Sequence, residues 1–228
     1  MILTYIRIFL ISILSILIAI STIILSPIDS KGKITHIISK IFSKGILIIS
    51  GIRMDVVGKD KLNPDDKYIF VSNHQSYFDI PILMQAIPNV VRFVYKKQLT
   101  KLPIFGWGMY LGQYIPIDRT DARSALLSLK KAAIKVRKGI SIALFPEGTR
   151  SPDGNIGDFK KGIFVLAEEA GVKIVPVTIK GSFNIMPKKT LRIKPGKVKV
   201  IFNEPLDFKK DKTFLQEIRE KIINNYNQ

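Results

Sequence analysis

The fold is decided by residues 121–145, DARSALLSLKKAAIKVRKGISIALF, in which a helical pattern leads directly into a buried strand. Between positions 121 and 138 apolar residues recur at helical spacing among lysines, which predicts an amphipathic helix. Gly139 ends this helix, and residues 140–145 form an apolar run typical of a strand covered on both faces. A helix that returns into a buried strand indicates an α/β fold.

The same alternation continues on both sides of this stretch. Strands are predicted at residues 52–56, 68–72, 91–95, 173–179 and 198–202, and helices at 160–170 and 211–225. Gly171 is a typical helix stop, and Pro81 favours a helix start near residues 79–81. We therefore expect residues 53–228 to form one α/β domain with a mixed, mostly parallel sheet flanked by helices.

The N-terminus has a different character. Residues 8–28 carry no charge, and as a helix they are long enough to cross a hydrocarbon core of roughly 30 Å. The alternative is a cleaved signal peptide, which usually has a shorter apolar region followed by a small-x-small cleavage site. Ala19-Ile20-Ser21 matches such a site poorly, so a membrane helix is favoured.

Residues 33–52 predict a second helix, because isoleucines recur at helical spacing beside Lys33, Lys40 and Lys44. This pattern fits a helix in the membrane interface, and it equally fits an amphipathic helix on the domain's own core. The break at residues 30–32 makes residues 1–52 a candidate membrane-anchoring αα-hairpin, which either spans the bilayer or enters one leaflet. Lysines after the apolar segment outnumber Arg7 before it, which predicts that the domain after the hairpin lies on the cytoplasmic side.

The charge balance restricts the partners. The 228 residues include 36 Lys+Arg and 18 Asp+Glu, giving a net charge of +18, with 46% hydrophobic residues. Such a charge suits nucleic acid or an anionic membrane surface. The basic residues are spread along the chain without interleaved aromatics or a recognition helix, which argues against nucleic acid. No cysteine is present, which excludes disulfides, thiolate metal sites and a cysteine nucleophile.

A first candidate for chemistry follows the strand at residues 68–72. His74 and Asp79 are five residues apart. On a regular helix five residues rotate by about 500°, so the two side chains would point about 140° apart around the helix axis. A direct contact between them therefore requires a loop or an irregular turn. The alternative is that Asp79 only caps the following helix.

A second candidate is Phe145-Pro146-Glu147-Gly148-Thr149-Arg150, directly after the strand at residues 140–145. Backbone N–H groups, a hydroxyl and a guanidinium together suit a phosphate or a carboxylate, although a turn with a solvated arginine would have the same sequence. Further basic candidates are Lys96, Arg119 in Ile117-Asp118-Arg119, and Lys160 at the start of a predicted helix.

Taken in order, Asn73-His74-x-x-x-x-Asp79, the Lys96 to Arg119 stretch, Phe145 to Arg150, and Val175-Pro176-Val177 resemble the four blocks of the lysophospholipid acyltransferase family. The resemblance implies transfer of a fatty acyl group from acyl carrier protein or coenzyme A to the 2-hydroxyl of lysophosphatidate, giving phosphatidate. Alternatives are another lysophospholipid or glycerol 3-phosphate as acceptor, or a non-catalytic protein that binds anionic lipid.

The resemblance also implies roles for residues. His74 would be the general base and Asp79 would orient it, with no acyl-enzyme. Four cations would bind the substrate phosphate: Lys96, Arg119, Arg150 and Lys160. Glu147 would order its loop or contact the glycerol, and Gly148 and Thr149 would present backbone groups. We expect no cofactor and no metal, because no histidine or carboxylate cluster has ligand spacing.

Overall fold

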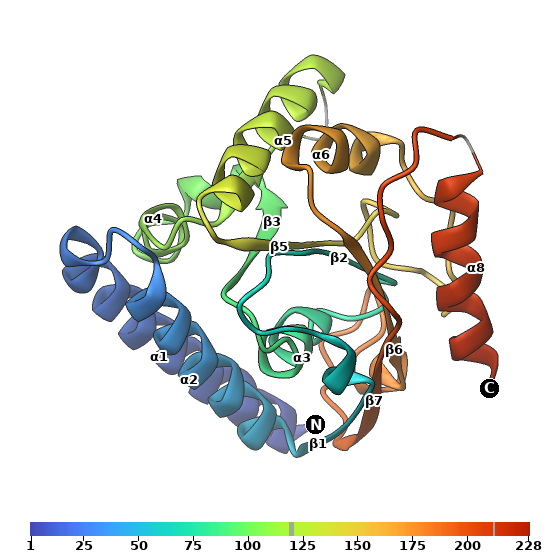
Figure 1. The fold of residues 1–228 in the computed structure, drawn as a ribbon. Helices are drawn as coiled ribbons and strands as arrows, with labels where there is room; N and C mark the ends of the chain where they lie inside the picture. Colours follow the sequence, from blue (N-terminus) through green and yellow to red (C-terminus); the bar gives the residue numbers. More distant parts are fainter. Residues whose placement is uncertain (119–120, 212) are drawn as a thin grey trace.

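A mixed, mostly parallel sheet forms the centre of the protein in the computed structural model, which describes residues 1–118, 121–211 and 213–228 (Figure 1). Its strand order is β1-β7-β6-β2-β5-β3-β4, and every neighbouring pair is parallel except β6 and β7. The strands are β1 (Ile52–Val57), β2 (Ile69–Ser72), β3 (Val91–Lys96), β4 (Ile115–Ile117), β5 (Ser141–Leu144), β6 (Ile174–Lys180) and β7 (Gly196–Phe202).

Helices cover both faces of the sheet. They are α1 (Ile2–Leu25), α2 (Lys33–Ser50), α3 (Asp79–Ala86), α4 (Phe105–Leu111), α5 (Ala122–Arg137), α6 (Gly162–Ala170), α7 (Ser182–Ile185) and α8 (Phe214–Asn227). The fold class predicted from the sequence is confirmed. Three short elements, α4, β4 and α7, were not predicted, because each is too short to show a periodic pattern.

Alternation along the strands builds two separate cores. In β2, Ile69 and Val71 point to one face and pack with α5, α6 and α8, while Phe70 points to the other and packs with α2 and α3. In β5, Ala143 shares the core of Phe70, while its neighbour Ile142 shares the core of Ile69. Both strands are fully buried because they lie in the middle of the sheet with helices on each side.

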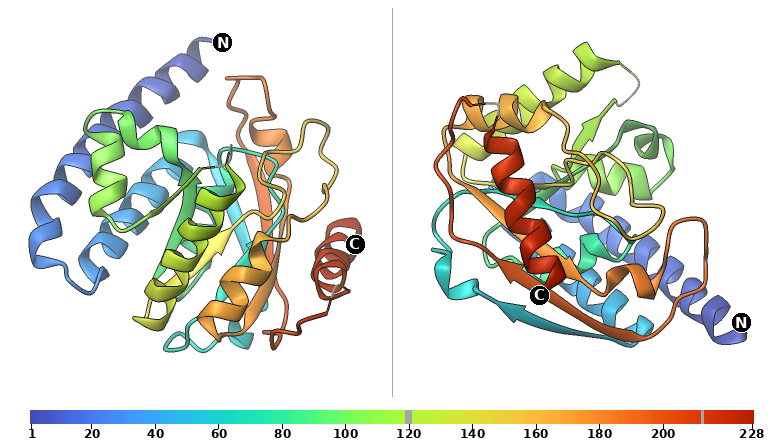
Figure 2. Two further views of the ribbon diagram at one scale, coloured as in Figure 1. Left: turned by 90° about the horizontal axis from the view of Figure 1, so that it is seen from above. Right: turned by 90° about the vertical axis from the view of Figure 1, so that its right-hand side faces the viewer.

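The N-terminal hairpin packs on the α/β domain (Figure 2). Helices α1 and α2 lie side by side, and α2 packs against α3, so the hairpin is part of the same compact body as the sheet. The isoleucine stripe of α2 is divided between two environments. Ile38 and Ile46 are buried in the protein, whereas Ile37 and Ile41 are 59% and 57% exposed. The interpretation as a helix on the protein's own core thus holds for the buried isoleucines, while the membrane interpretation of the exposed ones stays a prediction.

Two cations, one buried and one partly buried, attach the hairpin to the domain. Arg92, at the start of β3, is fully buried and donates to the backbone oxygens of Gly32, Val91 and Gly112 at 2.6, 2.9 and 2.6 Å. Lys40 of α2 donates to two backbone oxygens at the end of α3, and burial lowers its pKa to about 8. Lys40 therefore faces the domain, whereas the sequence pattern placed it on a lysine face beside the membrane.

Candidate active site

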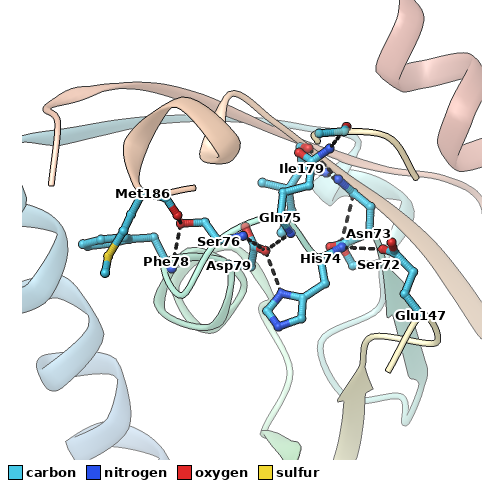
Figure 3. A network of polar contacts seen from close by, with 11 residues as sticks. Ser72, Asn73, His74, Gln75, Ser76, Phe78, Asp79, Glu147, Ile179 and Met186 are labelled. Atoms are coloured by element: carbon cyan, nitrogen blue, oxygen red, sulfur yellow. Dashed lines mark hydrogen bonds and ion pairs between the residues drawn. The ribbon is translucent and has the colours of Figure 1, made fainter. Parts of the chain in front are cut away.

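His74 and Asp79 are in direct contact at the carboxyl end of β2 (Figure 3). The chain leaves β2 at Ser72 and makes an irregular turn before α3 begins at Asp79. His74 Nδ1 lies 2.8 Å from Asp79 Oδ2, which also accepts the backbone N–H groups of Gln75 (2.6 Å) and Ser76 (2.8 Å). The carboxylate therefore both holds the imidazole and closes the turn that brings it within reach.

This arrangement defines the tautomer of the histidine. Asp79 Oδ2 accepts two backbone N–H groups and therefore acts as a hydrogen-bond acceptor. In its contact with His74 the hydrogen then lies on Nδ1, which donates to Oδ2. In the neutral imidazole the lone pair then lies on Nε2, which faces a cavity. Asp79 is fully buried, whereas the side chain of His74 is 14% exposed. A histidine in this state can take a proton from a bound hydroxyl group.

Both neighbouring strands hold the His74 loop in place. On the β6 side, the Asn73 side chain accepts the N–H of Ile179 at 2.8 Å and donates to its oxygen at 2.9 Å, so it continues the pairing beyond the end of β2. On the β5 side, Phe145 stacks on the His74 ring with centroids 4.0 Å apart and an angle of 12° between the rings. The imidazole is thus restrained at its edge by Asp79 and on one face by Phe145.

Glu147 connects two loops from inside the protein. Its Oε1 accepts the backbone N–H of His74 at 2.7 Å and its Oε2 accepts that of Gly157 at 3.0 Å. Ser151 N–H donates to the oxygen of His74 at 2.7 Å, so both backbone groups of the histidine are attached to the segment after β5. Burial raises the pKa of Glu147, and the two backbone N–H groups oppose this shift. The contacts of Glu147 are those of a loop-ordering residue; contact with glycerol stays a prediction.

The predicted cations divide between two neighbouring cavities. The larger, about 890 Å³, is lined by residues of α1, α2, α3, α4 and β3, and its lining includes His74, Tyr77, Lys96, Thr149 and Arg150. The smaller, about 450 Å³, is lined by Gly148 and Lys160 and by apolar residues of α5 and α6. Arg119 lies outside the described residues, so its predicted role stays a prediction.

Three residues at the site were not singled out from the sequence. Phe145 supports the imidazole and lines both cavities, and Tyr77 stacks under Arg150. Lys188, from the segment after α7, donates to the Thr149 hydroxyl at 3.2 Å. Tyr77 and Phe145 lie within the two motifs, so their position in the sequence was a signal that could have pointed to them. Lys188 is one of many lysines in a polar stretch, and nothing in its surroundings distinguishes it.

Comparison with known proteins agrees with this geometry. Residues 53–180 match the model of the acyltransferase family. Chloroplast 1-acyl-sn-glycerol-3-phosphate acyltransferases of Brassica napus and Arabidopsis thaliana are each 37% identical to the chain over 86% of its length. The chain spans 57% and 55% of those two proteins.

A solved structure extends the similarity to the whole fold. The 1-acyl-sn-glycerophosphate acyltransferase of Thermotoga maritima superimposes with a TM-score of 0.84 at 26% identity, covering 98% of this chain and 93% of that one. The α/β fold and the matched region define an acyltransferase domain. The chain belongs to the acyltransferase family.

Proposed function

We propose that the protein transfers a fatty acyl group from the thioester of acyl carrier protein or coenzyme A to the sn-2 hydroxyl of 1-acyl-glycerol-3-phosphate, producing phosphatidate. The observation that carries the proposal is the His74–Asp79 pair, whose open Nε2 faces a cavity with apolar walls and a cationic rim. The names of the relatives support the same acceptor.

The reaction follows from the orientation of His74. Nε2 takes the proton of the sn-2 hydroxyl as that oxygen attacks the thioester carbonyl carbon, and the imidazolium formed is stabilised by Asp79. When the tetrahedral intermediate collapses, the C–S bond breaks and the thiolate receives the proton back from His74. An ester and a free thiol result, so atoms and charge balance without a cofactor.

No group in the protein need carry the acyl chain. The chain has no cysteine, and Ser76, the serine within the His74 motif, is fully buried and donates to the oxygen of Met186 at 3.1 Å. A hydroxyl so engaged is not available to Nε2 of His74, which supports direct transfer between the two substrates.

The phosphate of the acceptor would lie against the cations of the rim. Arg150 and Lys96 line the cavity that contains His74, and Lys160 lies beyond Gly148 in the adjacent one. A guanidinium can bind a phosphate with two parallel hydrogen bonds, which would direct the glycerol hydroxyl toward His74. Such orientation lowers the barrier by several kcal/mol when it replaces a random encounter.

We also propose that the hairpin anchors the protein to the cytoplasmic face of a membrane. Helix α1 is the one helix among the described residues that is long and apolar enough to cross a bilayer, and only three of its residues, Thr4, Ala19 and Thr22, are buried. The hydroxyl groups of its three serines, Ser12, Ser15 and Ser21, donate to backbone oxygens of the same helix, which suits an apolar solvent. Beside α1, Trp107 and Tyr110 of α4 are exposed, as aromatic side chains are at a membrane interface.

The test is acyl transfer by the purified protein and by its His74→Ala variant, measured with both thioesters over several chain lengths. We expect the original protein to acylate lysophosphatidate and the variant to lose this activity. His36→Asn, at the other histidine of the chain, is the matched control and should remain active. Full activity of His74→Ala would refute the mechanism. No transfer by the original protein would favour a non-catalytic lipid-binding role, and preference for another acceptor would change the substrate.

A further inference from the structure

Tyr77 is exposed in the middle of a buried segment. Its side chain is 58% exposed, whereas its neighbours Ser76 and Phe78 are 0% and 4% exposed. The cause is the turn around Asp79: the carboxylate binds the N–H groups before Tyr77, and Ser76 donates to the oxygen of Met186. The turn therefore directs Phe78 into the core and Tyr77 out toward the cavity of His74.

The ring of Tyr77 supports Arg150. The guanidinium carbon lies 3.5 Å from the ring centroid, which is well within the range of a cation–π contact. Among the described residues no carboxylate forms an ion pair with Arg150, and its Nη1 is buried without a hydrogen-bond partner. An aromatic face is thus the main group that orients this guanidinium.

This mode of support leaves the arginine able to bind an anion. A carboxylate partner would occupy the edge of the guanidinium that carries its N–H donors and would compete with a phosphate. A ring contacts only the flat face, so the donors along the edge stay available. Tyr77, Arg150 and His74 line one cavity, and a single turn held by Asp79 carries both the imidazole and the ring.

We propose that Tyr77 is a positioning residue for the phosphate of the acceptor. It holds Arg150 at a set place relative to His74, so that a lysophosphatidate bound through its phosphate presents its sn-2 hydroxyl to Nε2. This inference rests on the proposed function and names one part of its specificity.

The experiment compares steady-state kinetics of four proteins: the original and the Tyr77→Phe, Tyr77→Trp and Tyr77→Leu variants. Loss of a cation–π contact predicts that Tyr77→Leu raises the KM for lysophosphatidate about 3- to 30-fold. The KM for the thioester should stay within about twofold, because His74 and its contacts are unchanged, and any fall in kcat should be confined to acceptors that carry a phosphate. Phe and Trp keep an aromatic face, so both should retain the original KM for lysophosphatidate.

Two further measurements separate positioning from a general structural effect. In an Arg150→Gln background, Tyr77→Leu should have no additional effect, because the partner of the ring is already absent. With monoacylglycerol, an acceptor without phosphate, Tyr77→Leu should match the original protein. Tyr77→Leu should also unfold at the denaturant concentration of the original protein, since the side chain is mostly exposed.

An unchanged KM for lysophosphatidate in Tyr77→Leu would overturn the inference while leaving the proposed function intact. A Tyr77→Phe variant as impaired as Tyr77→Leu would also overturn it, because the hydroxyl rather than the ring would then be needed. Absence of transfer by the original protein is a different result and would refute the proposed function itself.

Discussion

The Asp79→Asn substitution can separate the charge of this residue from its hydrogen bonds. In the structure, Oδ2 accepts from His74 Nδ1 and from two backbone N–H groups, while Oδ1 is buried without a hydrogen-bond partner. An asparagine can place its amide oxygen at Oδ2 and its NH2 group at Oδ1. The reverse orientation would direct NH2 at three N–H donors, so the turn and the tautomer of His74 should be retained.

What is lost is the negative charge beside the imidazolium that the proposed reaction forms. Opposite unit charges about 4 Å apart interact by about 4 kcal/mol at an effective dielectric constant of 20. At about 1.4 kcal/mol per factor of ten, loss of this term lowers kcat by up to about 10³-fold. Exchange of charged for neutral hydrogen bonds at the turn should reduce the free energy of unfolding by about 1–3 kcal/mol, which leaves a folded protein.

The assay is the rate of thiol release at saturating lysophosphatidate and thioester, together with a denaturant titration of each variant. Asp79→Ala is the comparison, because it removes both the charge and the acceptor of the two backbone groups, and it should be less stable than Asp79→Asn. A folded Asp79→Asn variant with kcat within about threefold of the original would refute the proposed charge stabilisation. A loss as large as that of His74→Ala would show that the geometry of the pair also depends on the charge.

Two other predictions concern the loop after β5 and the metal requirement. In Glu147→Gln, an NH2 group replaces one carboxylate oxygen and faces a backbone N–H group, either that of His74 or that of Gly157, so one hydrogen bond is lost. We expect urea titration to show a loss of about 1–3 kcal/mol in the free energy of unfolding. An unchanged midpoint would contradict the bridging role of Glu147. Acyl transfer should be unaffected by a chelator, because no group of three or more metal-binding side chains occurs within residues 1–118, 121–211 and 213–228; a loss that added divalent cation restores would contradict this expectation.

Periodic patterns predicted those parts of the fold that depend on local surroundings. The helix at α5 and the buried strand at β5 were predicted from residues 121–145, because a buried strand and an amphipathic helix each impose a repeat on their own sequence. The long apolar helix at the N-terminus was also predicted, from the uncharged run of residues 8–28. For the α2 helix the same reasoning was incomplete: the apolar stripe is real, but only the packing of α2 in the folded protein decides that Ile38 is covered and Ile37 is exposed.

The sequence by itself determined which residues are candidates for chemistry: a histidine and an aspartate five positions apart, and a loop with Glu147 and Arg150. Only the tertiary structure decided how these two motifs meet. Strands β2 and β5 are parallel neighbours, so their carboxyl ends lie at one edge of the sheet and bring together residues more than 70 positions apart. Strand order depends on how all the segments pack, and no local pattern records it. For that reason the contacts of Glu147 with the His74 backbone, and of Arg150 with Tyr77, were visible only in the folded chain.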